Sequence, residues 1–504
     1  MRSRSIKPCS RARTFTIRRT RRSRACASLI TLRPNRKNRT MKTNELGLMC
    51  CQTTLQSIGA FMVAQPRVRA GAHDENTPRL VGHTHGAAQT RPRRLLLCLD
   101  GVPFEIMQAA QARGLFAGFN EPARLLSPFP TMTNIALATM LKASVPLGYE
   151  TVYFDRQAQE LRGSIGKYIG RRTPDKVPSS YMDELDYQEP LPFEFLVYVA
   201  PDAVWRADMR RFRERFRAAP QTRDYFGFLK GTDGLLHIRG PEKLQPALES
   251  LDGILRELQA WGGRETEIVL FSDHGMNLEE VRKVHLLTHL REQGYEVKSE
   301  FRGRGPRKLA VPAFGLIGFA ALYCSDETDP AEVAATLAPL EGVDFSLYRD
   351  GNSAVIVHGA RGRARIRRTT NGAGTRFAYE QLDGDPLELA PVLGELQAAG
   401  EVDAQGFAAD AAWFARTGAH TYPDALANLF AAIQHGDRVH NAADVLVSTR
   451  DGYYYGWSAL ERIVHLHATH GNARRQSTTA FLMSTHRNFT PYVRGSEARP
   501  LLRE

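Results

Sequence analysis

The chain has 504 residues, of which 42% are hydrophobic and 24% are charged. This composition is typical of a globular protein of about three domains, and it excludes collagen-like, coiled-coil and wholly disordered chains. The net charge of +13 would suit a nucleic-acid-binding protein, but it is concentrated at the N-terminus. Residues 1–40 hold 14 Lys and Arg and no acidic residue, and the first 94 residues together carry +18, so residues 95–504 carry −5.

The basic leader, residues 1–93, has no apolar periodicity, and we expect it to be disordered. Its functional interpretations are a nucleic-acid-binding arm and a targeting peptide. A non-functional extension, or translation from Met41 or Met49, is favoured over both. Polar residues interrupt the apolar stretch 46–62, so the leader contains no convincing secretory signal. A cytoplasmic location is therefore favoured, with a periplasmic or secreted location left open.

The remainder of the chain contains two of the six cysteines, Cys98 and Cys324, so we expect no disulfide framework there. Its most apolar run, residues 309–324, is shorter than the roughly 20 residues that a transmembrane helix needs and contains Pro312 and two glycines. We interpret this run as buried strand and turn, and we expect no membrane span.

Ordered structure is predicted to begin at Arg94. A continuous apolar run at 95–99 and mostly apolar runs at 193–199 and 267–271 predict buried strands. Helical patterns are found at 103–113, 135–142, 244–261 and 278–293. Strands that alternate with helices predict an α/β fold with a mostly parallel central sheet and helices on both faces.

The pattern changes between residues 300 and 385. It predicts a small α+β cap insert, 301–385, formed by a strand at 318–323, a helix at 330–340 and strands at 353–357 and 364–368. Helices at 404–416 and 422–433 follow before a return to the main sheet. The catalytic domain is thus expected in two parts, 94–300 and 386–490, with a tail at 491–504.

Four strand ends or loops carry carboxylates and imidazoles, the residue types that bind zinc or manganese. The candidate ligands are Asp100, Asp233, His237, Asp273, His274 and the histidines of segment 465–470. Two of these groups directly follow predicted strands, where open α/β sheets bind their ligands. Three aspartates and three histidines suffice for two metals about 4 Å apart, an arrangement used for in-line phosphoryl displacement.

A candidate nucleophile lies in the segment 129–134, just before a predicted helix. A threonine hydroxyl at a helix N-terminus meets backbone N–H groups that favour a developing oxyanion, and a metal nearby would lower its pKa. This segment offers both Thr131 and Thr133. From this segment alone, the interpretation that Thr131 or Thr133 is only the N-cap of the helix is as well supported as the interpretation that it is a nucleophile.

These motifs, in this order, resemble the alkaline phosphatase superfamily, nearest to its type I phosphodiesterase/nucleotide pyrophosphatase branch. The resemblance covers about residues 94–300 and 385–490, and its motifs are Leu99-Asp100-Gly101, Pro130–Asn134, Thr232-Asp233-Gly234-x2-His237, Ser272–Met276 and His470-Gly471. It implies an alkaline phosphatase-like fold and two Zn²⁺ ions. One ion would be held by Asp233, His237 and His470, and the other by Asp100, Asp273, His274 and the nucleophile Thr133.

The resemblance also chooses between residues of similar type. The family pattern favours Thr133 over Thr131 as nucleophile and implies that Asn134 helps to hold a non-bridging oxygen of the substrate. It favours His470 as the metal ligand and leaves His465 and His467 as residues that contact the ligands and not the metal. Two other pairs of histidines are interpreted as not binding metal: His83 with His85, and His285 with His289. The family's Pro-Asn pair after the nucleophile is absent, which leaves nucleotide specificity open, and no sulfatase motif is present.

The sequence therefore predicts a two-metal phosphohydrolase, foremost a phosphodiesterase that acts through a phosphothreonyl intermediate on Thr133 and takes a small-molecule phosphate ester. Segments 145–190 and 300–385 are expected to cap the site and to choose the leaving group. The enzymatic alternatives are a phosphomonoesterase, a phosphonoacetate-type hydrolase and a phosphoethanolamine transferase. The non-enzyme alternative, a nucleic-acid-associated protein that uses the leader, is disfavoured because every metal-ligand position is filled. Zinc is favoured over manganese, and the physiological substrate and oligomeric state stay open.

Overall fold

The computed structural model describes residues 93–163 and 177–503, apart from the single positions 198, 264, 304, 373 and 463. The predictions for the basic leader, including the pair His83 and His85, lie outside the described residues. All elements named below belong to one of two units of the chain, residues 71–504.

The predicted strands 95–99 and 267–271 are neighbours inside a six-stranded sheet of order β20-β2-β19-β6-β1-β5. Strand β1 (Arg94–Leu99) pairs in parallel with both β5 (Tyr225–Leu229) and β6 (Glu267–Ser272). Strand β19 (Thr479–Ser484) is antiparallel to β6 and to β2 (Ala123–Leu126), which pairs in parallel with β20 (Tyr492–Arg494). The predicted mostly parallel sheet is confirmed.

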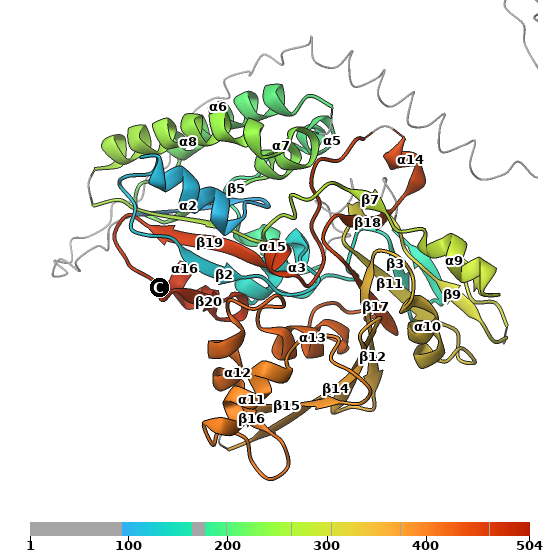
Figure 1. Ribbon diagram of the computed structural model, residues 1–504. Helices are drawn as coiled ribbons and strands as arrows, with labels where there is room; N and C mark the ends of the chain where they lie inside the picture. Colours follow the sequence, from blue (N-terminus) through green and yellow to red (C-terminus); the bar gives the residue numbers. More distant parts are fainter. Residues whose placement is uncertain are drawn as a thin grey trace, which may run out of the picture. The chain divides into compact units, whose positions relative to one another are not determined.

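Both faces of this main sheet are covered by helices, because successive side chains of a strand point to opposite faces. Leu95, Leu97 and Leu99 of β1 pack in one core cluster, while Leu96 and Cys98 pack in another. The first cluster includes side chains of α2 (Phe104–Ala112), α6 (Pro201–Ala218), α7 (Gly231–Arg239) and α8 (Pro241–Gly262). The second includes side chains of α3 (Thr133–Met140) and α16 (Ala498–Arg503). Figure 1 shows α6 and α8 along one side of the sheet and α3 and α16 along the other.

A second sheet of nine strands follows the order β16-β15-β14-β13-β12-β17-β11-β9-β8 and is antiparallel except between β8 and β9. Its strands are β8 (Glu296–Val297), β9 (Lys308–Ala310), β11 (Phe319–Cys324), β12 (Val343–Asp350), β13 (Ala354–Gly359), β14 (Gly362–Asn371), β15 (Gly374–Gln381), β16 (Ala408–Ala409) and β17 (Val445–Thr449). The predicted strands at 318–323, 353–357 and 364–368 are among them. The sheet also takes in β17, which lies beyond the segment 301–385.

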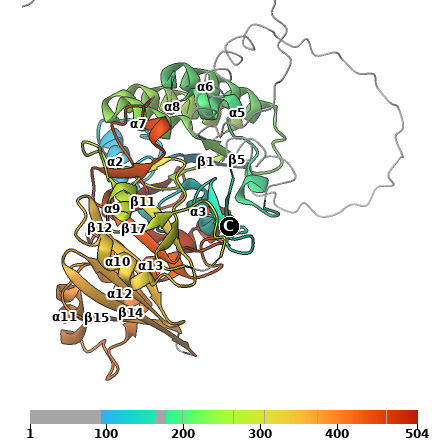
Figure 2. The ribbon, with the colours of Figure 1, turned by 90° about the vertical axis from the view of Figure 1, so that its right-hand side faces the viewer.

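Helices cover this second sheet on both faces as well (Figure 2). Helices α9 (Leu286–Glu292) and α10 (Pro330–Leu337) pack against one face. The other face is covered by α11 (Ala390–Ala398), α12 (Asp410–Thr417) and α13 (Ala425–Ile433). Ile135 of α3 joins that second core, whereas Ala136 and Leu137 join the core of the main sheet. Helix α3 therefore lies where the two cores meet.

The remaining elements are short. Strands β10 (Leu316–Ile317), β18 (Tyr453–Gly456) and β7 (Arg282–Lys283) form a three-stranded sheet, and β3 (Tyr153–Asp155) and β4 (Glu160–Arg162) form a hairpin. The short helices are α5 (Leu191–Leu196), α14 (Ser458–Glu461), α15 (Arg475–Thr478) and the 3₁₀ turns η1 (Tyr181–Glu184) and η2 (Gly495–Glu497).

Three predicted elements are wrong in type or extent. The predicted helix 404–416 begins only at Asp410, because Ala408 and Ala409 form β16, which pairs with β15. The predicted strand 193–199 is replaced by helix α5, because an apolar run of this length is compatible with either structure and Pro192 fits the first turn of a helix. The predicted helix 278–293 begins only at Leu286. The residues before it are extended, because the N–H groups of Arg282 and Val284 donate to the carbonyls of Gly452 and Tyr454.

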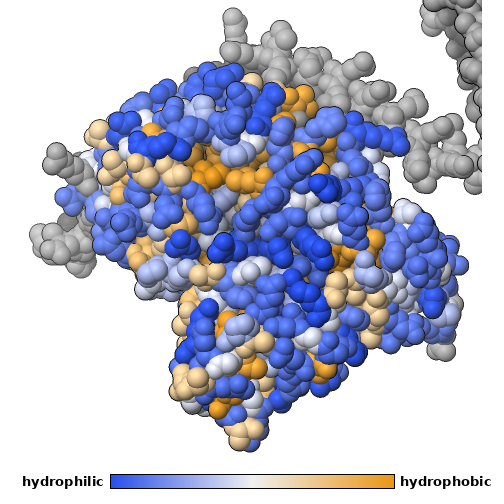
Figure 3. All heavy atoms as spheres, viewed as in Figure 1, coloured by the Kyte–Doolittle hydropathy of each residue, from blue (hydrophilic) through white to orange (hydrophobic). Residues whose placement is uncertain are grey.

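Apolar side chains are gathered mainly in the cores. On the face seen in Figure 3, hydrophilic side chains predominate and apolar ones form separate patches. Cys98 and Cys324 both have free thiols. Across residues 93–163 and 177–503 we find no helix with the length and apolar character that crossing a membrane requires.

Candidate metal centre

The candidate ligands converge at the carboxyl edge of the main sheet. Asp100 follows the last residue of β1, and Asp273 and His274 follow the last residue of β6. Helix α7 begins two residues after β5 and presents Asp233 and His237 one turn apart on one face. The parallel register of β1, β5 and β6 therefore brings three sequence motifs to one place.

Two groups of three buried side chains result, each with ligand atoms within 4.8 Å of one another. In the first, Asp233 Oδ1 lies 3.2 Å from His237 Nε2 and 3.7 Å from His470 Nε2. In the second, His274 Nε2 lies 3.4 Å from Asp100 Oδ1 and 3.5 Å from Asp273 Oδ2. The two groups adjoin, because the rings of His274 and His470 stack with centroids 4.0 Å apart. The sequence-predicted ligands are thus brought together in the predicted sets.

All three histidines are oriented by backbone carbonyls. Their Nδ1 atoms lie 2.7 Å from Ala468 O for His237, 2.9 Å from Gly275 O for His274 and 2.7 Å from Thr131 O for His470. A carbonyl only accepts hydrogen bonds, so each contact places the proton on Nδ1 and leaves a lone pair on Nε2. This is the arrangement that metal-binding histidines adopt.

The carboxylates show the complementary feature. Among the described residues, Asp100 Oδ2, Asp233 Oδ1 and Asp273 Oδ2 are buried oxygens without a hydrogen-bond donor. Buried polar atoms are normally hydrogen-bonded, so three such oxygens in one place indicate that a cation is the missing partner. The donor set of carboxylate oxygens and imidazole nitrogens suits zinc or manganese, and the residues therefore fit the two metals that the motifs imply.

The pKa values reflect the same crowding of charge. Burial raises the pKa of Asp100 well above its ordinary range, and the negative charges of Asp273 and Asp233 raise it further. Burial raises the pKa of Asp273 as well. Burial opposes ionisation of Asp233 too, but His237 and His470 outweigh it and lower the pKa of that carboxyl. Burial and the neighbouring His274 lower the pKa of His470 well below its ordinary value, which keeps its Nε2 free to bind a metal.

Thr133 is the first residue of α3, and its hydroxyl faces the second group of ligands. Its Oγ1 donates to Asp100 Oδ1 at 3.2 Å and lies 3.4 Å from His274 Nε2. Neither threonine is the N-cap, a position that Met132 occupies. Thr131 is fully buried, and its Oγ1 accepts the N–H of Gly471 at 2.8 Å while its carbonyl holds His470. The geometry thus separates the two threonines by role.

Asn134 directs its side chain away from the ligands. Its Nδ2 donates to the carbonyls of Gly148 and Tyr149 at 3.5 and 3.4 Å, so the amide group is bound to another loop. Its backbone N–H belongs to the first turn of α3, where N–H groups lack partners within the helix. The backbone N–H of Asn134 is therefore better placed than its side chain to hold a substrate oxygen.

The other histidines of the C-terminal segment and the pair His285 and His289 are not part of either ligand group. His465 and His467 are exposed, and neither belongs to a group that could hold a metal among the described residues. His285 is exposed, and His289 Nε2 contacts the carbonyl of Thr336 at 2.9 Å.

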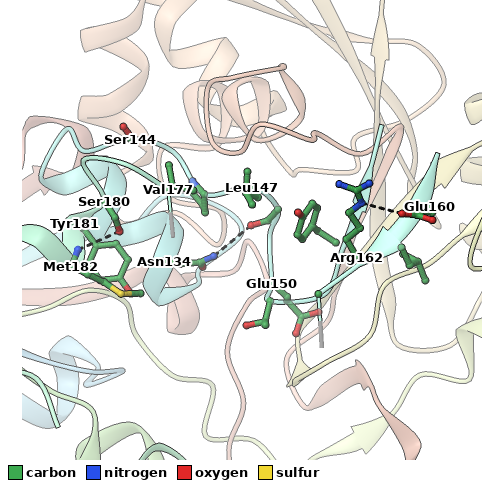
Figure 4. A pocket seen from close by; sticks show the side chains of 16 residues that line it. Asn134, Ser144, Leu147, Glu150, Glu160, Arg162, Val177, Ser180, Tyr181 and Met182 are labelled. Carbon is green, nitrogen blue, oxygen red and sulfur yellow. Dashed lines mark hydrogen bonds and ion pairs between the residues drawn. The ribbon is translucent and has the colours of Figure 1, made fainter. Parts of the chain in front are cut away.

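A cavity of 690 Å³ adjoins Asn134. Its walls are formed by residues 144–163 and 177–182, and Glu150, Tyr153 and Tyr181 are among the side chains that line it (Figure 4). Glu150 Oε1 accepts the N–H of Gly315 at 2.6 Å. Burial nevertheless raises the pKa of Glu150 to about 7. Neither this acid nor the orienting role of Thr131 is signalled by a sequence motif, because each depends on a contact with a distant segment.

A comparison with family sequence profiles identifies the family of this chain. The sequence profile of the type I phosphodiesterase/nucleotide pyrophosphatase family matches residues 142–471, well over half of the chain. The structure is similar to phosphonoacetate hydrolase from Sinorhizobium meliloti 1021 in complex with phosphonoformate, with 14% identity, a TM-score of 0.46 and coverage of 82% of this chain and 95% of that chain. It is also similar to human ectonucleotide pyrophosphatase/phosphodiesterase 5, with 11% identity, a TM-score of 0.44 and coverage of 81% and 93%. Among curated proteins none matches. The chain belongs to the type I phosphodiesterase/nucleotide pyrophosphatase family, a family of phosphoester hydrolases.

Proposed function

We propose that the protein is a phosphodiesterase that uses two divalent metals and a threonine nucleophile. Asp233, His237 and His470 would hold one metal, and Asp100, Asp273 and His274 would hold the other next to Thr133. The observation that carries this proposal is the pair of buried ligand groups, each with a donorless carboxylate oxygen and oriented histidines, beside one half-buried hydroxyl. When bound, two such cations supply charge neutralisation at the phosphoryl group and a lowered pKa for the attacking hydroxyl.

Thr133 is the group that attacks phosphorus in this proposal. Its hydrogen bond to Asp100 draws the proton away from Oγ1, which makes the oxygen a better nucleophile. A bond forms between Thr133 Oγ1 and phosphorus as the bond from phosphorus to the leaving oxygen breaks, and the proton of the hydroxyl passes to solvent or to the departing oxygen. The oxygen of a water molecule then bonds to phosphorus as the bond from phosphorus to Thr133 Oγ1 breaks, so that one water proton restores the hydroxyl and the phosphoryl product is released. The backbone N–H groups at the start of α3 face the negative charge that develops on a non-bridging oxygen.

The cavity beside Asn134 favours a diester over a monoester. It adjoins the first turn of α3 and offers room for a second organic group, with two tyrosines, two glutamates and one arginine among the residues of its walls. These walls lie within the segment 144–182, so we propose that this part of the expected cap chooses the leaving group. The lining contains no residue of 301–385 among the described residues.

The test is hydrolysis of bis(4-nitrophenyl) phosphate and of 4-nitrophenyl phosphate by the full chain loaded with zinc. We expect the diester to be the better substrate. Thr133→Ala should lose at least about a thousandfold in kcat, as removal of a catalytic nucleophile does, while still binding both metals. Thr133→Ser should keep measurable turnover because it keeps a hydroxyl. Turnover by Thr133→Ala at the wild-type rate would refute the nucleophile, and preference for the monoester would identify a phosphomonoesterase.

A further inference from the structure

We propose that Asp451 is a positioning residue that holds the two metal-ligand loops against each other. Asp451 lies in the turn between β17 and β18, belongs to neither group of candidate ligands and has 19% of its side chain exposed. The inference rests on the proposed metal centre, and it concerns how this chain keeps the two ligand groups adjacent.

One oxygen of Asp451 accepts hydrogen bonds from both ligand loops. Its Oδ1 lies 2.7 Å from Asn277 Nδ2 and 3.0 Å from Asn472 Nδ2. Asn277 follows His274 by three residues, and Asn472 follows His470 by two. Both asparagines are buried, with 0% and 1% of their surface exposed, so the amide groups depend on this carboxylate as their acceptor.

The two loops are also joined by hydrogen bonds between their backbones. The N–H of Asn277 donates to Thr469 O at 2.7 Å, and the N–H of Thr469 donates to Asn277 O at 3.0 Å. This bridge lies one residue before His470 and three residues after His274. Asp451 therefore fixes the separation of two histidines that belong to different metal groups and whose rings stack at 4.0 Å.

The other oxygen of Asp451 contacts Arg474, whose side chain is anchored to the second sheet. Arg474 Nη1 lies 3.4 Å from Asp451 Oδ2, and Arg474 Nε donates to Asp344 Oδ2 at 2.9 Å. Asp344 is buried in β12. The carboxylate is thus fixed on one side by an anchored guanidinium, and it presents Oδ1 to the asparagines in one orientation. Outer contacts of this kind usually change metal affinity by 10- to 100-fold when they are removed.

A second carboxylate provides a matched control. Asp444 immediately precedes β17, and Asp451 is the second residue after that strand. The side chain of Asp444 is 12% exposed. It pairs with Arg156 at 2.8 Å and Arg349 at 3.3 Å and accepts the N–H of Cys324 at 2.8 Å. These partners lie on other segments than the two ligand loops. Asp444→Ala thus removes a comparable half-buried ion pair without touching the candidate centre.

The experiment measures stepwise zinc affinity by competition with a chromophoric chelator, using the full chain and the variants Asp451→Ala, Asp451→Asn and Asp444→Ala. Asp451→Ala should weaken both zinc sites 10- to 100-fold and change the visible absorption spectrum of the cobalt-loaded protein. Asp451→Asn keeps an oxygen for the asparagines but turns an amide toward Arg474, so its loss should be smaller. Asp444→Ala should lower the Tm while it keeps wild-type zinc affinities.

Each outcome has a distinct meaning. Wild-type affinity at both sites in Asp451→Ala would overturn the positioning role, and so would an equal loss in Asp444→Ala. If Asp451→Ala does not fold, wild-type affinity and an unchanged cobalt spectrum in Asp451→Asn would overturn the role, and a measurable loss would support it. Failure of the wild-type protein to bind two zinc ions would instead refute the proposed metal centre itself.

Discussion

At the scale of single residues, the structure distinguishes histidines that share one segment. His467 and His470 are three residues apart, but His467 is exposed while His470 is buried with its Nδ1 on the carbonyl of Thr131. His470→Ala should therefore remove one of two bound zinc ions, which metal analysis of the dialysed protein would measure. His467→Ala is the matched control and should keep two. A full complement of zinc in His470→Ala would contradict the assignment.

Thr131 illustrates a role that depends on orientation alone. Its hydroxyl accepts the N–H of Gly471 and donates to Asn472 O, so it fixes the loop that carries His470. Thr131→Val keeps the size of the side chain but removes these bonds. We expect the affinity of the Asp233, His237 and His470 site for zinc to fall about tenfold, with the other site unchanged. Equal weakening of both sites in a chelator competition would show instead that the substitution disturbs the whole centre.

At the scale of elements, the turn after β1 has little tolerance for a side chain. Gly101 has φ +71°, and a Cβ there would lie 3.0 Å from Asp233 Oδ1 and 3.1 Å from Met276 Cε. Gly101→Ala should lower the free energy of unfolding by about 1–2 kcal/mol and weaken zinc binding, because left-handed backbone and the contact with Asp233 both oppose the methyl group.

A glycine inside helix α8 provides the control for that substitution. A Cβ at Gly253 would have no neighbouring atom within 4 Å. Gly253→Ala should therefore raise the free energy of unfolding by about 0.5–1 kcal/mol and leave zinc binding unchanged. Urea denaturation of both variants measures the two opposite signs. A stable, zinc-binding Gly101→Ala protein would show that the turn can relax.

Much of the main sheet could be predicted because several of its strands are indicated by local patterns in the sequence. The run Leu95–Leu99 is apolar at every position because both faces of β1 are covered. The end of this strand also determines where Asp100, the next residue, lies. The run 193–199 looks alike in sequence but forms α5, and β5 takes the place beside β1. Local pattern does not decide which of two apolar runs pairs with a given strand, because that choice depends on tertiary packing.

The candidate centre divides in the same way. Its six candidate ligands and Thr133 occur in short motifs, so the sequence could propose them together, and the six side chains lie in two adjacent groups. Thr131, Glu150 and Asp451 act through contacts with residues that are distant in the sequence. Thr131 contacts His470, 339 residues away, Glu150 contacts Gly315, 165 residues away, and Asp451 contacts Asn277, 174 residues away. These partners meet only in the folded chain, so no spacing of residues in the sequence predicts the contacts.

At the scale of the whole molecule, buried acids connect stability to pH. Burial raises the pKa of Glu150 to about 7 and that of Asp208 to about 7. A carboxyl whose pKa is raised by folding keeps its proton in the folded state when the unfolded chain has already lost it. Its contribution to stability is thus complete below about pH 4 and is lost as pH rises through the folded pKa.

Glu150→Gln tests this linkage. The free energy of unfolding of the wild-type protein should fall by about 1–3 kcal/mol more than that of Glu150→Gln between pH 5 and pH 8, since the amide does not ionise. Urea denaturation at the two pH values measures the difference. Parallel curves would show that Glu150 ionises with an ordinary pKa in the folded protein, and a steeper fall in the variant would show that folding lowers that pKa.

The mass of the peptide that contains Thr133 tests most directly whether this residue attacks phosphorus. The zinc-loaded protein is mixed with bis(4-nitrophenyl) phosphate, quenched in acid within the first turnovers and digested. We expect one nitrophenyl phosphoryl group to be attached to Thr133, and to be found on the serine in Thr133→Ser. A group attached to Thr131, or rapid turnover with no covalent adduct on either threonine, would contradict the assignment of Thr133 as the nucleophile.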